Sequence, residues 1–299
     1  MITQKNYAAI DIGSNAVRLL VMTITEQAGK ETDFRKTSLV RVPIRLGEDV
    51  FLREYISEKN IDRMVDTMQA FGLLMKAHGI ERYKACATSA MREAKNGKDV
   101  AKLVKKKSGV EIEIIDGTHE AAIIAATDLH ELVQNDHNYL YVDVGGGSTE
   151  YTVYSNGNTI ASKSFKVGTV RLLNDLVEHK TWETMEQWVK ENTAGYKEIC
   201  LIGSGGNINN IFKTSGKKEG KPLSLSYIKK YYELLNSYSY EERITELKLK
   251  NDRADVIIPA SRIYLSAMKW AKAHKVYVPK IGLADGIIKS LYNEDKKKD

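Results

Sequence analysis

Cysteine is scarce in this chain, which has 2 cysteines among 299 residues. Two isolated cysteines make neither a disulfide framework nor a zinc site, so we expect Cys86 and Cys200 to be buried thiols. Long hydrophobic runs are also lacking, and none approaches the roughly 20 residues that span a bilayer. Residues 1–5 lead straight into a predicted strand and leave no room for a signal peptide. We therefore expect a cytoplasmic protein with no membrane partner.

Two common nucleotide-binding signatures are missing as well. The chain has no Gly-x-x-x-x-Gly-Lys-Ser/Thr loop and no Gly-x-Gly-x-x-Gly after its first predicted strand, which argues against P-loop and dinucleotide-binding proteins. Its formal net charge of +6 comes partly from lysine runs at 105–107, 217–218 and 296–298. No nucleic-acid-binding motif accompanies these runs, so we expect no specific nucleic acid partner. The charge fits a polyanionic small substrate.

The length suits two domains of ordinary size, and 42% hydrophobic residues suffice for a core in each. Apolar residues recur at helical spacing over residues 57–78, with Ser57 as the predicted N-cap. Further helices are predicted over residues 89–107, 121–133, 226–249 and 254–274. Short strand-like runs alternate with these helices, which predicts an α/β fold. We expect domains at residues 1–125 and 126–284, with a final helix, 285–299, packing back on the first.

One sequence motif occurs twice, at Ala8–Asn15 and at Leu140–Glu150. In each copy an apolar run leads to a lone Asp, then to a turn of Gly and Ser, then to a second apolar run, which predicts a β-hairpin. Glycine lets backbone amides approach a ligand closely, so such a turn is an anion site. A third Gly-rich turn follows a predicted strand at 203–206. The candidate phosphate ligands are Gly13, Ser14, Asn15, Gly145, Gly146, Gly147, Ser148, Thr149, Gly205 and Gly206.

A carboxylate precedes each of the repeated turns, Asp11 in the first and Asp143 in the second. A carboxylate there repels phosphate unless a cation lies between them. Mg²⁺ is the natural candidate, because one or two carboxylates, phosphate oxygens and waters usually hold it. Asp143 and Asp11 are therefore candidate metal ligands. Glu150, just past the second turn, is either a further metal or water ligand or an ordinary surface residue of the hairpin.

Hydrolysis by water needs a general base, and Glu120 is the candidate because it lies at the predicted crossover between the domains. The alternative is that the helix dipole alone favours a Glu in the first turn of a helix. Arg92 follows a strand-to-helix turn, where a guanidinium could grip phosphate with two hydrogen bonds. Arg18 and Arg171 are weaker phosphate-binding candidates, for which surface salt bridges are the preferred alternative.

Five motifs, in this order and at this spacing, resemble the exopolyphosphatase/guanosine pentaphosphate phosphohydrolase family. They lie at residues 11–15, 87–92, 142–150, 167–171 and 253–257. The family belongs to the actin-like, sugar-kinase and heat-shock-70 ATPase superfamily. The resemblance therefore implies two ribonuclease-H-like lobes, each a mixed five-stranded sheet flanked by helices, with an active-site cleft between them.

The resemblance also implies a Mg²⁺-dependent hydrolase that releases terminal phosphate from inorganic polyphosphate, guanosine pentaphosphate or both. Glu120 matches the family's catalytic base, Asp143 and Glu150 match its metal or water-positioning carboxylates, and Arg92 matches its phosphate-binding arginine. Two arginines of the family pattern are replaced, by Ala122 and Ala284.

These losses leave an alternative, a sensor that holds a nucleotide or polyphosphate without useful turnover. A kinase or ATPase of the same superfamily ranks last. The tyrosine-rich segment 227–240 is either a homodimer interface or, as we prefer, part of the core.

Overall fold

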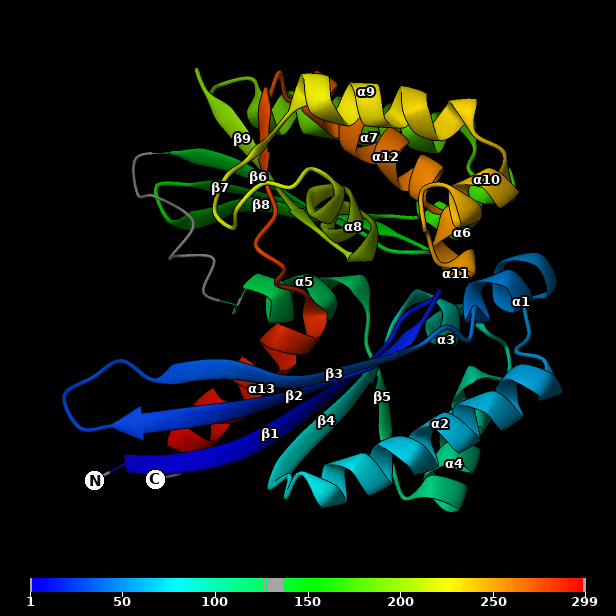
Figure 1. Cartoon of the computed structure of the whole chain (residues 1–299), viewed down its shortest axis with the longest axis vertical. Coiled ribbons are helices and arrows are strands. Elements are labelled where there is room, and N and C mark those ends of the chain that lie inside the picture. Colours follow the sequence, from blue (N-terminus) through cyan, green and yellow to red (C-terminus); the bar gives the residue numbers. More distant parts are fainter. Residues whose placement is uncertain (1, 126, 128–136, 298–299) are drawn as a thin grey trace. The chain divides into compact units, whose positions relative to one another are not determined.

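The computed structural model describes residues 2–125, 127 and 137–297. The chain divides into two compact units, one of residues 1–127 with 283–299 and the other of residues 128–282. Each unit has one mixed sheet flanked by helices (Figure 1), so the predicted α/β class is confirmed. In the described part of the chain, no helix has the length and apolar character needed to cross a membrane.

The sheet of the first unit has the expected five strands, in the order β3-β2-β1-β4-β5. They are β1 (Ile2–Ile12), β2 (Val17–Gln27), β3 (Asp33–Val42), β4 (Arg82–Ala87) and β5 (Ile112–Ile114). The hairpin strand β1 pairs antiparallel with β2 and parallel with β4, which places the end of β1 in the middle of the sheet.

The sheet of the second unit repeats this plan as β8-β7-β6-β9-β11 and adds a sixth strand, β10, beside β11. The strands are β6 (Asn138–Val144), β7 (Thr149–Ser155), β8 (Asn158–Phe165), β9 (Ile199–Ser204), β10 (Leu223–Ser224) and β11 (Lys275–Tyr277). Here β6 takes the place of β1, because it pairs antiparallel with β7 and parallel with β9. The repeated sequence motif therefore lies in the central hairpin of both sheets.

One helix of the first unit, at residues 46–53, was not predicted, and one predicted helix is broken in two. They are α1 (Leu46–Arg53), α2 (Glu58–Ala77), α3 (Ser89–Glu93), α4 (Gly97–Ser108), α5 (Gly117–Ala125) and α13 (Leu283–Lys296). Ser57 caps α2 as predicted, since its side chain accepts from the Asn60 amide. The single helix predicted over 89–107 is wrong, because Asn96 leaves the helix to exchange two hydrogen bonds with the backbone of Ile56. Residues 126 and 128–133 of the helix predicted over 121–133 lie outside the described residues.

The helices of the second unit are α6 (Thr169–Leu173), α7 (His179–Thr193), α8 (Gly206–Thr214), α9 (Leu225–Ser237), α10 (Tyr240–Thr245), α11 (Asn251–Ala254) and α12 (Ile257–Trp270). The run predicted over 226–249 ends at Ser237, and a capping box of Ser239 and Glu242 starts α10. The helix predicted over 254–274 is shorter, as α12.

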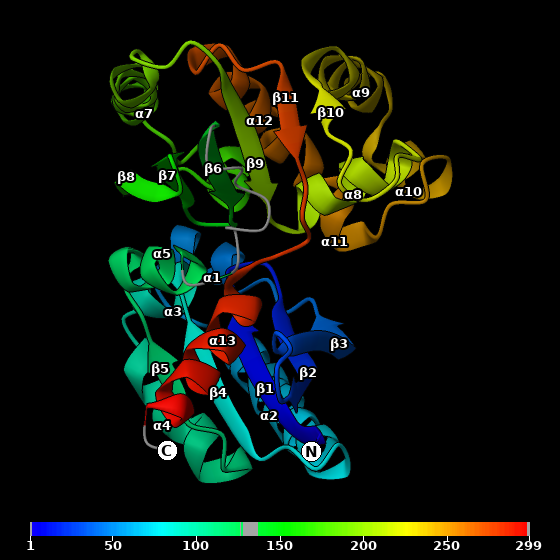
Figure 2. The same cartoon turned by 90° about the vertical axis from the view of Figure 1, so that its left-hand side faces the viewer.

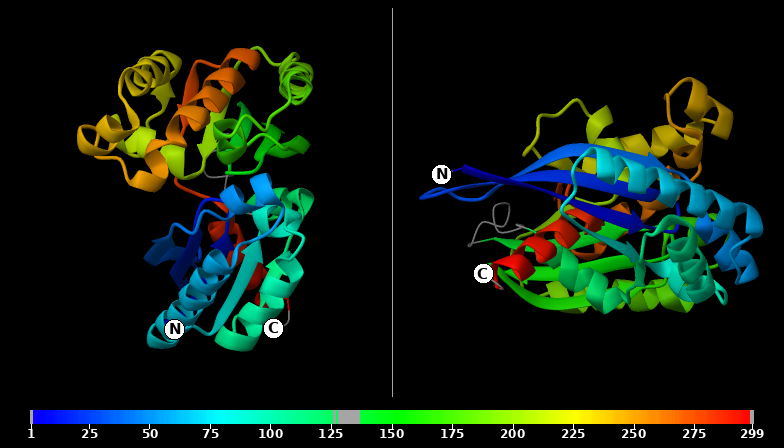
Figure 3. Two further views of the ribbon diagram at one scale, coloured as in Figure 1. Left: turned by 90° about the vertical axis from the view of Figure 1, so that its right-hand side faces the viewer. Right: turned by 90° about the horizontal axis from the view of Figure 1, so that it is seen from below.

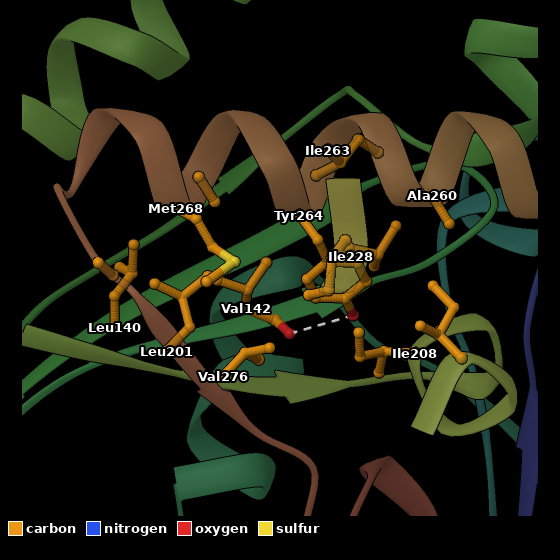
Figure 4. Close-up of a cluster of buried hydrophobic side chains, with 14 of the residues drawn as sticks. Leu140, Val142, Leu201, Ile208, Ile228, Ala260, Ile263, Tyr264, Met268 and Val276 are labelled. Atoms are coloured by element: carbon orange, nitrogen blue, oxygen red, sulfur yellow. Dashed lines mark hydrogen bonds between the residues drawn. The ribbon is translucent and has the colours of Figure 1, made fainter. Parts of the chain in front are cut away.

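The core of the second unit lies where α12 packs over the sheet (Figure 4). Tyr264 of α12 crosses this core, and its hydroxyl donates to the carbonyl oxygens of Ser204 and Val142. Tyr231 belongs to the same core and stacks on Tyr227, so core packing accounts for this part of the tyrosine-rich segment. The prediction of a buried thiol holds for Cys86 but is wrong for Cys200, which is half-buried because alternate residues of β9 face away from the core.

In the first unit, α2 and α4 cover one face of the sheet and α13 covers the other, along β1 and β4 (Figure 2). The reverse view shows α2 and α4 in front (Figure 3). Helix α13 also packs on α5, and Gly286 is the point of closest approach. A Cβ added to Gly286 would lie 2.2 Å from the Ile123 carbonyl oxygen, so only glycine fits here.

We expect Gly286→Ala to lower the free energy of unfolding by about 2 kcal/mol, the usual cost of overpacking. The matched control is Gly72→Ala in α2, where the nearest atom to the added Cβ is 4.0 Å away. That substitution removes a helix-interior glycine, and we expect it to stabilise by about 0.5–1 kcal/mol. Urea unfolding of both variants tests the pair, and equal stability of the two would refute the close α5–α13 contact.

Candidate active site

The two repeated turns have the same geometry. Residues 13–16 connect β1 to β2, and residues 145–148 connect β6 to β7. In the first turn the Gly13 amide donates to the Ala16 carbonyl at 3.1 Å, and in the second the Gly145 amide donates to the Ser148 carbonyl at 3.0 Å. The candidate ligands at 13–15 and 145–148 therefore lie in matching four-residue turns, one in each unit.

The start of α6 holds the second turn in place by hydrogen bonds to the carbonyl oxygens of the turn; we call such support a brace. The amides of Thr169 and Val170 donate to the carbonyls of Gly145 and Gly146, at 3.0 and 2.9 Å. The Arg171 Nε donates to the Gly147 carbonyl at 2.7 Å. Exposed carbonyl oxygens repel phosphate. Because these three carbonyl oxygens accept hydrogen bonds from α6, the turn favours an anion. Arg171, for which a surface salt bridge was the preferred prediction, is thus bonded to the turn itself.

Gly168 allows this bracing because it touches the turn with its backbone. A Cβ at Gly168 would lie 2.4 Å from the Gly146 carbonyl carbon and oxygen and 2.5 Å from the Gly147 carbonyl carbon. Thr149 supports the same segment from the strand, since its fully buried hydroxyl donates to the Val167 carbonyl at 2.5 Å. Thr149 was predicted as a phosphate ligand, but its hydroxyl instead bonds to the segment that supports the turn.

The first turn has an equivalent brace, which sequence reasoning missed. The Gly47 amide donates to the Ser14 carbonyl at 2.7 Å, and the Arg45 amide donates to the Asn15 carbonyl at 3.1 Å. Gly47 also lies against Ser14, with 3.1 Å from an added Cβ to the Ser14 Cβ. The available signal was a glycine at the start of a helix after the third strand, in the place that Gly168 has in the second unit.

The two hairpins differ in the residue opposite the Asp. Strand register pairs Asp143 with Glu150 in the second unit, and Asp11 with Arg18 in the first. Directly opposed residues have Cβ atoms about 5 Å apart, so Asp143 and Glu150 form a diacid. Glu150 is 2% exposed and accepts from the Ser164 hydroxyl at 2.9 Å. This burial is inconsistent with the alternative of an ordinary surface residue.

In the first hairpin the acid is neutralised by an ion pair. Arg18 Nη1 donates to Asp11 Oδ2 at 3.0 Å, and Asp11 is buried. Burial raises the pKa of Asp11 above its ordinary value, while the charge and hydrogen bond of Arg18 oppose that rise. A salt bridge, the preferred prediction for Arg18, is what the structure contains.

We expect Arg18→Met to lower the free energy of unfolding at pH 7 by about 2 kcal/mol, because it leaves a buried carboxylate without its cation. The folded-state pKa of Asp11 lies above the unfolded value, so the cost of its charge is present at neutral pH and is lost as the pH falls through the folded-state pKa. Urea unfolding should therefore show a smaller loss at acidic pH than at pH 7. The double variant Asp11→Asn/Arg18→Met should recover stability at pH 7, and an equal loss at both pH values would contradict a charge effect.

Arg92 and Glu120 each bond to the backbone at the junction of β5 and α5. Arg92 Nη1 donates to the Ile115 carbonyl at 2.6 Å, directly before Asp116 caps α5. The Glu120 amide donates to the Asp116 carbonyl at 2.9 Å, in the first turn of that helix. Glu120 is 8% exposed, which is unusual for a carboxylate placed only to complement a helix dipole.

The Cys86 thiol lies beside the end of the first hairpin. Cys86 lies opposite Asp11 in the register of β4 and β1. Burial, opposed by the charge of Lys84, raises the pKa of the Cys86 thiol to about 12, and the negative charges of Asp11 and Glu120 contribute to that rise. Register thus places Cys86 beside Asp11 at the end of the first sheet, next to the turn at 13–16.

The third glycine turn lies beside Asp143 in the second unit. Gly205 has a positive φ of 108°, and a Cβ there would lie 3.4 Å from Asp143 Oδ1 and 3.0 Å from the Val144 carbonyl oxygen. Gly206 begins α8 directly after it. The structure thus brings Asp143, Glu150, the turn at 145–148 and Gly205–Gly206 to one end of the second sheet.

A family model described as the Ppx/GppA phosphatase family matches residues 24–295. The chain belongs to the Ppx/GppA phosphatase family. The solved exopolyphosphatase of Cytophaga hutchinsonii has a TM-score of 0.83 over 97% of this chain and 98% of that one, at 20% identity. This likeness confirms the actin-like fold that was expected for a Ppx/GppA protein.

Two curated relatives are similar over part of the chain. Exopolyphosphatase 1 of Mycobacterium bovis is 25% identical over 193 residues, which cover 64% of this chain and 52% of that protein. The guanosine-5'-triphosphate,3'-diphosphate pyrophosphatase of Photobacterium profundum is 30% identical over 167 residues, 56% of this chain and 32% of that protein. The matched region therefore spans about half of the first relative and a third of the second.

The donor set in this Ppx/GppA chain suits Mg²⁺ at one of the two turns. Within residues 2–125, 127 and 137–297, no group of three or more His, Cys, Asp or Glu side chains could hold a metal ion. Mg²⁺ needs only one or two carboxylates when phosphate and water complete its shell. The Asp143–Glu150 diacid fits that requirement, whereas the ion pair with Arg18 makes Asp11 a poor ligand.

Proposed function

We propose that this chain is a Mg²⁺-dependent phosphohydrolase that releases the terminal phosphate of inorganic polyphosphate, guanosine pentaphosphate or both. The observation that carries the proposal is the braced turn at 145–148 beside the Asp143–Glu150 diacid, because it combines an anion site with a cation site. The names of the two curated relatives support the same reaction class.

Each group has a role in this proposal. Backbone amides of the turn at 145–148 bind oxygens of the terminal phosphate, and the Arg92 guanidinium binds others. Glu120 accepts a proton from water as the water oxygen bonds to phosphorus and the phosphoanhydride bond breaks, leaving the shortened chain with the electron pair. Mg²⁺ held by Asp143 and Glu150 would supply positive charge to the phosphate oxygens.

The deciding experiment measures phosphate release by the wild-type chain from tripolyphosphate, long-chain polyphosphate and guanosine pentaphosphate, with Mg²⁺ or with EDTA. Release that needs Mg²⁺ supports the hydrolase and ranks its substrates. Tight substrate binding without release would instead support the sensor, which the alanines at 122 and 284 motivate. If the chain neither released phosphate from these substrates nor bound them, the proposal would be overturned.

A further inference from the structure

A cluster of exposed lysines lies on the second unit, between α8 and β10. Residues 213–221 contain four lysines and one glutamate, and all five side chains are exposed. We call this segment, with Lys213, Lys217, Lys218 and Lys221, the lysine loop. Its backbone has local order, because the amide of Gly216 donates to the Lys213 carbonyl at 3.3 Å and that of Lys221 to the Lys218 carbonyl at 3.2 Å.

A fifth lysine from a distant part of the sequence joins this cluster. Lys280 Nζ lies 3.5 Å from Glu219 Oε2, the one carboxylate of the loop. Lys280 follows β11, so the ion pair connects the lysine loop to the segment after the sheet. The acid within the loop is thereby neutralised, and the surface around it is strongly positive.

The segment that contains Lys280 also touches the strand end next to Asp143. The Ser204 hydroxyl donates to the Ile281 carbonyl at 2.9 Å, and Ser204 is the register partner of Asp143. Lys280 directly precedes Ile281 in the chain. The positive surface therefore begins within the same unit, next to the strands that carry the proposed phosphate and Mg²⁺ ligands.

We propose that the lysine loop and Lys280 bind the distal phosphates of long inorganic polyphosphate while its terminal phosphate lies at the turn at 145–148. The inference rests on the proposed function and assigns its substrate class. Each internal phosphate of the polymer carries a negative charge, so a linear polyanion can contact several lysines at once. Guanosine pentaphosphate carries a 5′-triphosphate and a 3′-diphosphate on one nucleoside and has no polymeric tail. Long polyphosphate is therefore the substrate that gains from this surface.

The lysines at 105–107 make a suitable contrast. They are exposed and form the last turn of α4, where positive charge complements the helix dipole. Lys105 is also paired with Glu111 at 2.8 Å. The helix dipole of α4 thus accounts for the lysines at 105–107. In the lysine loop, only Lys213 lies in the last turn of a helix.

The test compares two variants of equal charge change, Lys213→Gln/Lys218→Gln/Lys221→Gln and Lys105→Gln/Lys106→Gln/Lys107→Gln. The first keeps Lys217, whose Nζ donates to the Pro222 carbonyl at 2.6 Å, so the loop keeps that bond. We expect the loop variant to raise KM for long-chain polyphosphate about tenfold, with kcat and the values for tripolyphosphate and guanosine pentaphosphate unchanged. Its KM should also depend less on salt than that of the wild type.

Three results would overturn the inference: an unchanged KM for the long chain, an equal rise for all three substrates, or an equal effect of the 105–107 variant. If the wild type releases no phosphate from any substrate, the proposed function fails instead. Titration of fluorescently labelled long-chain polyphosphate then still tests the surface. Weaker binding by the loop variant alone supports the inference, and equal binding by all three proteins refutes it.

Discussion

We expect Glu120→Gln to lower the rate of phosphate release about 1,000-fold while substrate binding stays close to that of the wild type. A positioned general base contributes roughly 100- to 10,000-fold. Glutamine keeps the shape of the side chain and its contacts at the start of α5, but it cannot accept the proton of the attacking water. Release rates under saturating substrate, together with a titration of bound substrate, measure the two effects separately.

The matched control for this substitution is Glu111→Gln, in the same unit. Glu111 is exposed and pairs with Lys105, so we expect its variant to keep the wild-type rate. A rate within about threefold of wild type for Glu120→Gln would remove Glu120 from the proton transfer. Equal losses of rate in both variants would indicate a general effect of removing negative charge.

The sequence was sufficient to predict both hairpins, while the five strands that the two sheets share were implied by the family resemblance. The repeated order of apolar run, Asp, glycine turn and apolar run is local information, and local information determines a hairpin. The break between α3 and α4 could not be predicted in this way. It depends on two hydrogen bonds that Asn96 exchanges with the backbone of Ile56, 40 residues earlier in the chain, and such a tertiary contact overrides helical periodicity.

The candidate site, like the fold, was predictable from the sequence where it depends on local motifs and not where it depends on tertiary contacts. Asp143 and the turn at 145–148 are recognisable as a motif, but the different character of the two turns depends on strand register. Arg18 opposes Asp11 while Glu150 opposes Asp143, and only this pairing shows one turn with a neutralised acid and the other with a diacid. The contacts of Gly47 and Gly168 with the turns needed the structure, because two strands separate each glycine in sequence from the turn that it contacts.

The brace at Gly168 leads to the second large expected effect. We expect Gly168→Ala to lower kcat for phosphate release about 100-fold, because the new Cβ would lie 2.4 Å from the Gly146 carbonyl and must displace the turn. Displacement of a binding group by about 1 Å can cost this much, since the amides then miss the phosphate oxygens in the transition state.

The control for Gly168→Ala is Gly195→Ala in the same unit, where an added Cβ meets no atom within 4 Å. We expect that variant to keep the wild-type rate. Overpacking at Gly168 also costs about 1–3 kcal/mol of stability, so both variants are assayed at a temperature well below their unfolding midpoints. A folded Gly168→Ala protein with the wild-type rate would show that the turn tolerates displacement. In that case the turn at 145–148 could not be the group that positions the transferred phosphate.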